Sequence, residues 1–152
     1  MLGTMAYKSK YNPINTRKYM GDPTNIVCRS MWERKMCKYL DTNQNVLRWG
    51  SEEIAIPYYS PVDKKVRRYY PDFIVEKKTN DGKSVETLMI EVKPFHQTKP
   101  PQKKKKSRKT LINETLTYEV NQAKWKYATD YCKRNGWKFV ILTEKDIFPQ
   151  HK

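Results

Sequence analysis

The sequence lacks the long apolar runs and the paired cysteines that mark several classes of protein. No apolar run approaches the roughly 18 residues that a membrane-spanning helix needs, so we expect no membrane contact. The N-terminus shows no apolar stretch followed by a small-residue cleavage site, so we expect no secretory signal. Cys28, Cys37 and Cys132 are odd in number and form no Cys-x-x-Cys pair, which argues against a zinc site or a disulfide framework. A reducing cytoplasm fits best, with each cysteine a small buried hydrophobic side chain.

Acidic residues are only about half as numerous as basic ones. The 152 residues include 31 Lys and Arg against 16 Asp and Glu, a formal net charge of +15. Such a protein attracts polyanions through its long-range field and through counterion release, and nucleic acid is the commonest partner of this kind. A basic surface kept for solubility, or for anionic lipid or ribosomal RNA, is the alternative.

The chain is long enough for one domain with one core. Residues 1–29 are rich in Lys, Tyr, Asn and Pro without periodicity, which predicts an irregular basic N-terminal arm, and a single domain is expected over residues 30–148. A helix should begin with Ser30 as its N-cap and Glu33 completing a capping box, and it should end in the polar cluster at 41–45. Its apolar residues at helical spacing are Met31, Trp32, Met36, Tyr39 and Leu40.

Three strands are expected after this helix. Residues 46–49 and 53–59 come next, and the alternation of Ile54, Ile56 and Tyr58 favours a strand. Residues 65–76 are predicted to form the returning strand. The hairpin signal at 79–82 leads into a third strand over 85–92, which is apolar enough to be central.

A basic segment and a second helix complete the domain. Seven of the eleven residues from 99 to 109 are basic, which predicts a mobile loop at about 97–110. A long helix is expected over 112–134, stopped by Asn135-Gly136, and a fourth strand over 137–142. The order predicts an α/β fold with a mixed four-stranded sheet flanked by helices. The expected apolar face of the long helix consists of Leu116, Val120, Ala123, Tyr127 and Tyr131.

The chemically informative pattern is Asp72, followed nineteen positions later by Glu91-Val92-Lys93. Neighbouring antiparallel strands can bring these residues together, and Glu91 and Lys93, two apart, point to one face of their strand. Two carboxylates and the Val92 carbonyl suit Mg²⁺, with Mn²⁺ as a substitute, and Lys93 can position the attacking water in phosphodiester hydrolysis. Charges at strand ends are also common by chance, but these interrupt an otherwise apolar strand.

The segments Pro71-Asp72 and Glu91-Val92-Lys93 resemble the PD-(D/E)XK signature of the restriction-endonuclease-like superfamily. The helix that begins at residues 30–34 resembles that of TnsA-type transposon endonucleases. The resemblance implies a restriction-endonuclease-like core (α-β-β-β-α-β), an Mg²⁺-dependent deoxyribonuclease and a place for Glu33 in the metal site. The alternative for Glu33 is a capping residue alone.

A narrower resemblance covers nearly the whole chain, from Met5 to Phe148. Segments 5–11, 21–25, 29–34 and 48–53 are similar to a family of nucleases that complete the heads of T-even-like tailed bacteriophages. This implies action on DNA or its ends after packaging, with phage head or portal and neck proteins as partners. It also implies a location in the host cytoplasm during assembly, or in the virion.

Several residues near the motif have open roles. Superfamily members often carry a Gln or Lys on the helix after the core strand, and Gln122, Lys124 and Lys126 are equal candidates. Either Glu52 or Glu53 could face the site, although a solvated carboxylate is the preferred interpretation. The segment 99–109 is tethered close to Lys93 and is expected to follow the DNA backbone. The expected DNA-binding residues are Lys103, Lys104, Lys105, Lys106, Arg108, Lys109, Arg67 and Arg68.

The sequence thus favours a metal-dependent endonuclease that acts on double-stranded DNA, including branched DNA or free ends. One alternative is a non-catalytic DNA-binding virion protein that plugs or stabilises the filled head. RNA processing is compatible with the same charge. The intact Asp72, Glu91 and Lys93 count against the non-catalytic alternative.

Overall fold

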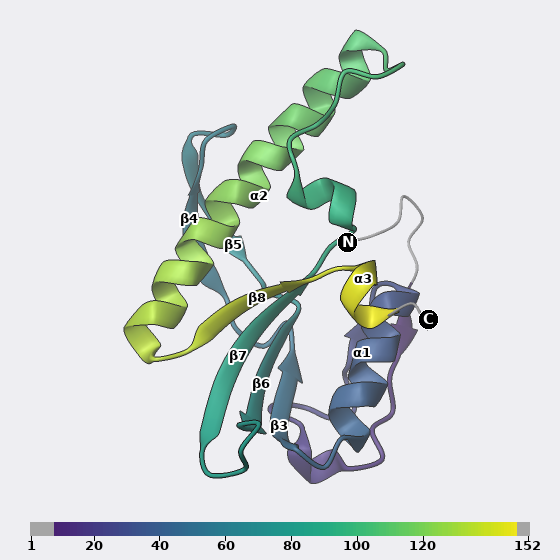
Figure 1. The fold of residues 1–152 in the computed structure, drawn as a ribbon, viewed down its shortest axis with the longest axis vertical. Coiled ribbons are helices and arrows are strands. Elements are labelled where there is room, and N and C mark those ends of the chain that lie inside the picture. The colour runs from purple at the N-terminus through teal and green to yellow at the C-terminus, as the bar shows by residue number, and fades with distance from the viewer. Residues whose placement is uncertain (1–7, 149–152) are drawn as a thin grey trace.

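The computed structural model describes residues 8–148 as a four-stranded sheet with a helix on each face (Figure 1). The elements in chain order are β1 (Ser9–Lys10), η1 (Thr16–Lys18), β2 (Val27–Cys28), α1 (Met31–Thr42), β3 (Val46–Ser51), β4 (Ile56–Ser60), β5 (Lys65–Tyr69), β6 (Phe73–Lys78), β7 (Val85–Val92), η2 (Phe95–Thr98), α2 (Arg108–Asn135), β8 (Lys138–Leu142) and α3 (Glu144–Ile147). The α/β class and the mixed four-stranded sheet predicted from the sequence are confirmed.

The main sheet has the strand order β3-β6-β7-β8. Strands β3, β6 and β7 are antiparallel neighbours, whereas β8 runs parallel to β7 after the crossover through α2. Phe73 of β6 pairs with Ser51 on one side and with Ile90 on the other. This register brings the end of β3, the start of β6 and the end of β7 together at one edge of the sheet.

The strand prediction was wrong at one point. The first strand of the sheet is β3, whereas β4 and β5 form a separate two-stranded hairpin, and the predicted strand over 65–76 is divided between β5 and β6. The division falls at residues 70–72, where Pro71 has no backbone N–H to donate to a ladder. Asp72 therefore lies just before β6 and not within a hairpin strand.

Two hydrophobic cores lie on opposite faces of the sheet. On the α1 face, Trp49, Phe73 and Ile90 pack with the inner side of α1. On the α2 face, Met89 and Trp125 belong to a second cluster, which also contains apolar residues of the β4–β5 hairpin. Because side chains alternate along β7, Glu91 and Lys93 share the α2 face with Met89.

Helix α1 begins as predicted but presents a different face. Ser30 is its N-cap and accepts a hydrogen bond from the backbone N–H of Glu33 at 3.1 Å. Met31 and Tyr39, which were expected inside, are 62% and 54% exposed. The buried residues of α1 are instead Glu33, Met36, Cys37, Leu40 and Asp41.

Residues 8–29 are irregular over most of their length and pack against the rest of the domain. Tyr11, Tyr19 and Ile26 are buried in the α1-side core. Buried Asp41 anchors the segment, since its carboxylate accepts hydrogen bonds from the Tyr11 hydroxyl and the Ile14 N–H, both at 2.7 Å. The expected arm residues 1–7 lie outside the described residues.

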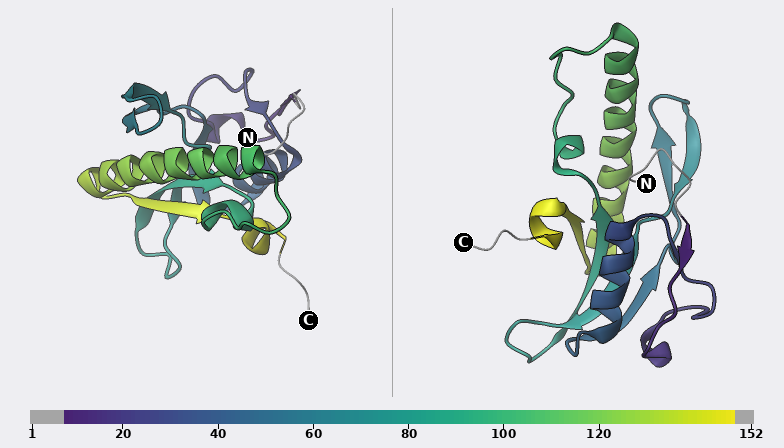
Figure 2. Two further views of the ribbon diagram at one scale, coloured as in Figure 1. Left: turned by 90° about the horizontal axis from the view of Figure 1, so that it is seen from above. Right: turned by 90° about the vertical axis from the view of Figure 1, so that its right-hand side faces the viewer.

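Helix α2 begins four residues earlier than predicted, at Arg108, after an N-cap at Ser107. Its apolar face was predicted only in part: Val120, Ala123 and Tyr131 pack against the α2-side core, whereas Leu116 and Tyr127 are about 40% exposed. The buried residues are Asn121, at the middle of the helix, and Trp125, Ala128 and Cys132 in the C-terminal half. The N-terminal half projects beyond the sheet, where the segment before it runs alongside (Figures 1 and 2).

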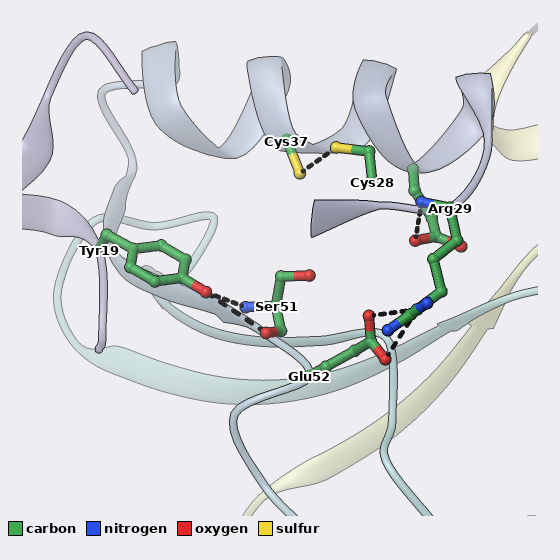
Figure 3. A network of polar contacts seen from close by, with 7 residues as sticks. Tyr19, Cys28, Arg29, Cys37, Ser51 and Glu52 are labelled. Carbon is green, nitrogen blue, oxygen red and sulfur yellow. Dashed lines mark hydrogen bonds and ion pairs between the residues drawn. The ribbon is translucent and has the colours of Figure 1, made fainter. Parts of the chain in front are cut away.

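The cysteines are buried, as expected, but two of them are neighbours. The Sγ atoms of Cys28 and Cys37 lie 3.5 Å apart between β2 and α1 (Figure 3). Within the described range, no helix is both long and apolar enough to cross a membrane.

Candidate active site

The end of β7 meets the start of β6 at the residues singled out from the sequence. Continuing the β6–β7 register one step beyond Phe73 and Ile90 places Asp72 opposite Glu91. The backbone N–H of Val92 donates a hydrogen bond to Oδ2 of Asp72 at 2.7 Å. This bond fixes the Asp72 carboxylate against the end of β7, so the structure brings the two acidic residues together.

Glu91 and Lys93 are charged residues in a buried position, with 5% and 8% of their surface exposed. The ammonium of Lys93 lies 3.6 Å from Oε2 of Glu91. The other oxygen, Oε1, is buried and accepts no hydrogen bond from any described residue. A buried carboxylate oxygen without a partner is unfavourable unless something else binds it, and a cation would satisfy it.

The raised pKa of Asp72 also indicates a place where a cation would bind. Burial raises the pKa of Asp72 well above its usual 3.8, and the negative charges of Glu91 and Glu33 raise it further. The Val92 N–H partly offsets this rise. Like charges held this close in a buried site disfavour ionisation, and a bound cation would relieve their repulsion.

Glu33 joins this group from the first turn of α1. Its Oε1 accepts a hydrogen bond from the backbone N–H of Arg29 at 3.1 Å, so the reciprocal half of the predicted capping box goes to Arg29 and not to Ser30. Burial raises the pKa of Glu33, and the charge of Glu52 adds to the rise. The capping contact and the proximity to Asp72 thus coexist in one residue.

Of the three candidates on the helix after the core strand, Lys124 lies near Asp72 and Glu91. Burial and the positive charge of Lys93 lower its pKa, while the charges of Glu91 and Asp72 act in the opposite direction. Its Nζ lies 5.6 Å from the centre of the Tyr69 ring. Gln122 and Lys126 are exposed and point elsewhere on α2.

Sequence reasoning missed Tyr69. Its hydroxyl is buried and faces the Glu91 carboxylate, without a hydrogen bond of regular geometry to any described residue. Burial raises the pKa of Tyr69, and so do the negative charge of Glu91 and the contact of the hydroxyl with the Glu91 carboxylate. Tyr69 follows the exposed Arg67 and Arg68 in the sequence, and no local signal marks it as the buried residue of β5.

Arg29 and Glu52 form a second missed contact (Figure 3). The guanidinium Nε of Arg29 lies 3.0 Å from Oε2 of Glu52, which contradicts the expectation of a solvated carboxylate. Glu52 has a left-handed backbone, with φ of 54°, and its N–H donates to the carbonyl of Asp72 at 3.1 Å. Glu53 is also engaged, since it accepts a 2.7 Å hydrogen bond from the hydroxyl of Tyr19.

The carboxylate oxygens of Asp72 and Glu91 suit a metal ion that keeps part of its water shell. Within residues 8–148, no three His, Cys, Asp or Glu side chains are grouped closely enough to enclose a metal ion by themselves. Mg²⁺ is commonly held by one or two carboxylates together with water and substrate phosphate. The unpartnered Glu91 oxygen beside Asp72 fits that mode of binding better than a closed cage.

The basic residues expected to contact DNA lie on two projections from the same end of the sheet (Figures 1 and 2). Lys103 to Lys105 are exposed in the segment before α2, and Lys106 pairs with Glu114 at 2.5 Å. Arg108 and Lys109 belong to the first turn of α2 and not to the loop. On the β4–β5 hairpin, Arg68 is exposed and Arg67 pairs with Asp63.

Comparison with known proteins identifies a matching family and a similar phage protein. Residues 43–144 match the family model described as the TnsA-like endonuclease N terminal. The chain is also 40% identical over 147 residues to the head completion nuclease of Enterobacteria phage T4, covering 94% of this chain and 95% of that protein. The family match includes Asp72, Glu91, Lys93 and Lys124, whereas Glu33 precedes it.

Proposed function

This chain belongs to the TnsA-like endonuclease family, and from that premise we propose that it hydrolyses DNA phosphodiesters at the Asp72–Glu91–Lys93 site with the help of Mg²⁺. The observation that carries the proposal is the buried Oε1 of Glu91, which lacks a hydrogen-bond partner among the described residues. Glu91 precedes Val92, whose N–H binds the Asp72 carboxylate. The convergence of two carboxylates and an ammonium in a buried place supports this role.

Asp72 and Glu91 are the proposed metal-holding side chains, with the Val92 carbonyl and Glu33 contributing. The mutual repulsion that raises the pKa of Asp72 supports this assignment. When bound, Mg²⁺ would lower the pKa of a coordinated water and polarise the phosphoryl oxygen, and Mn²⁺ should substitute. The Val92 N–H keeps Asp72 oriented toward this place.

Lys93 is the proposed catalytic cation. Its ammonium, 3.6 Å from Glu91, is positioned to orient the attacking water and to neutralise charge that develops in the transition state. Lys124 adds a second ammonium from α2, and its proposed role is to position the scissile phosphate. Arg29 and Glu52 hold the start of α1 against the end of β3, which supports the position of Glu33.

We further propose that the substrate is double-stranded DNA, bound through its phosphate backbone. The segment before α2 and the β4–β5 hairpin carry exposed cations on either side of the site, an arrangement suited to phosphate contacts. The similarity to the T4 protein supports a role in completing phage heads, with head or portal and neck proteins as partners. The host cytoplasm during assembly, or the virion, is the corresponding location.

The test compares Asp72→Asn and Glu91→Gln with Glu86→Gln. Glu86 lies on β7 but pairs with Lys138 at 3.4 Å, away from the site, so it is a matched control. Cleavage of linear, circular and branched DNA is measured with Mg²⁺, with Mn²⁺ and with a chelator. We expect the two site variants to lose cleavage and keep DNA binding, and the control to cut normally. Wild-type rates in both site variants would refute the assignment.

A further inference from the structure

A cavity of about 570 Å³ lies between the basic segment and the N-terminal half of α2. The residues that give it chemical character are Phe95, His96, Lys99, Lys104, Tyr118 and Asn121. His96 is thus part of its wall. The cavity accounts for a feature that core packing leaves unexplained, namely a helix half that projects from the sheet with a basic segment folded back along it (Figure 2).

The cavity begins beside the proposed active site. Phe95 comes two residues after Lys93, and Asn121 lies one helical turn before Lys124. Its lining on α2 runs from Asn113 to Asn121, which corresponds to about 12 Å of helix. A nucleic-acid strand that leaves the active site along α2 would therefore enter this cavity directly.

The lining combines cations with aromatic rings. Tyr118 on α2 and Phe95 on η2 contribute rings to the lining, and Lys99 and Lys104 contribute ammonium groups, that of Lys99 lying 5.6 Å from the centre of the Phe95 ring. The acidic side chain in the lining, Glu114, is neutralised by its pair with Lys106. Proteins bind single-stranded nucleic acid with this combination, stacking bases on aromatic rings and holding the backbone with cations.

The size of the cavity separates single-stranded from double-stranded occupants. Its volume is in the range of pockets that hold small ligands, on the order of 300–1,000 Å³. A short piece of a single strand fits such a space and a double helix does not. Asn121, which is 5% exposed at the inner end, has an amide that can pair with a base edge.

We propose that this cavity binds an unpaired strand of DNA that leaves the duplex next to the active site. The inference rests on the proposed nuclease function and narrows its substrate to DNA in which a duplex adjoins a single strand, as in a flap, a branch or a frayed end. The β4–β5 hairpin and the exposed lysines hold the duplex, and the cavity holds the displaced strand.

The test uses Tyr118→Ala, the ring-retaining Tyr118→Phe, and the control Tyr127→Ala. Tyr127 is 40% exposed on the same helix and lies outside the cavity. Affinity for a fluorescent twelve-residue oligothymidylate is measured, together with cleavage of a flapped duplex and of a blunt duplex of the same sequence. We expect Tyr118→Ala to weaken oligothymidylate binding roughly 5- to 150-fold and to abolish the preference for the flap. Tyr118→Phe and Tyr127→Ala should behave as wild type.

The outcomes separate this inference from the proposed function. If wild-type protein cuts both duplexes equally with Mg²⁺, or if Tyr118→Ala keeps its oligothymidylate affinity, the inference fails while the nuclease assignment stands. If the oligothymidylate protects Lys99 and Lys104 from chemical modification, the inference is supported. Absence of cleavage on every DNA with every metal would instead refute the proposed function.

Discussion

The two halves of α2 differ in what surrounds them. The C-terminal half buries Trp125, Ala128 and Cys132 against the sheet and the β4–β5 hairpin, and it holds Lys124 near Asp72 and Glu91. The N-terminal half buries no apolar residue completely, and Ile112 and Leu116 remain 49% and 41% exposed. One half of the helix thus positions a residue of the proposed active site, and the other half projects away from the sheet.

This difference indicates a division of labour. The packed half, with the ends of β6 and β7, should determine the rate of cleavage and the stability of the fold. The projecting half, with the basic segment, should determine affinity and substrate choice. Substitutions in the packed region and in the projecting region should therefore have different effects.

The largest effect is expected for Lys93→Met in the packed region. The variant keeps the length of the side chain but removes the ammonium next to Glu91, so kcat should fall roughly 100- to 1,000-fold, with little change in DNA affinity. Single-turnover cleavage with saturating Mg²⁺ measures this. An increase in KM with unchanged kcat would place Lys93 among the binding residues, and would contradict the idea that the packed region determines the rate of cleavage.

Trp125→Ala and Leu116→Ala compare the two halves by stability. Removing the ring of Trp125, which is 7% exposed, should lower the free energy of unfolding by about 3–5 kcal/mol. Leu116→Ala should change it by no more than about 0.5 kcal/mol. Urea denaturation in the absence of DNA measures both, and equal losses would show that the projecting half is part of the core.

Replacing Lys103, Lys104, Lys105 and Lys106 with Ser should weaken affinity without changing kcat. The slope of log affinity against log salt should become shallower by about 0.9 for every phosphate that the variant no longer neutralises. The control replaces Lys133 and Arg134, which are exposed at the other end of α2. An unchanged slope in the quadruple variant would remove the basic segment from the DNA-binding surface.

The smallest effect concerns the stability of the metal-free protein. The folded-state pKa of Asp72 is raised, so the protonated form is favoured by folding, and that stability is lost as pH rises from below the usual carboxyl pKa toward neutrality. Asp72→Asn should therefore melt at a higher temperature than wild type at pH 7 with a chelator present. The gap should shrink near pH 4, and an equal gap at both pH values would contradict this interpretation.

Local sequence signals predicted the parts of the fold that local chemistry determines. The Ser30 N-cap, the Gly136 helix stop and the apolar strand β7 are all observed. The spacing from Asp72 to Glu91 was also informative, because an antiparallel pair with a tight turn brings such residues opposite each other. The proximity of Asp72, Glu91 and Lys93 could therefore be expected before any coordinates.

Features that depend on distant partners could not be predicted. The apolar face of α2 was misjudged because Leu116 belongs to a projecting half that has no sheet beneath it. The Arg29–Glu52 pair and the inward side chain of Tyr69 depend on how separate elements meet. Among Gln122, Lys124 and Lys126, only the packing of α2 against the sheet distinguishes the lysine near the acidic group.

The most direct test of the central claim is a calorimetric titration of Mn²⁺ into the wild-type protein, Glu91→Gln and Glu86→Gln. The account predicts that wild type and Glu86→Gln bind Mn²⁺ with the same affinity. Glu91→Gln, which replaces the unpartnered buried oxygen by a neutral amide, should bind it roughly tenfold or more weakly. Unchanged Mn²⁺ affinity in Glu91→Gln would contradict the assignment of this site as the metal centre.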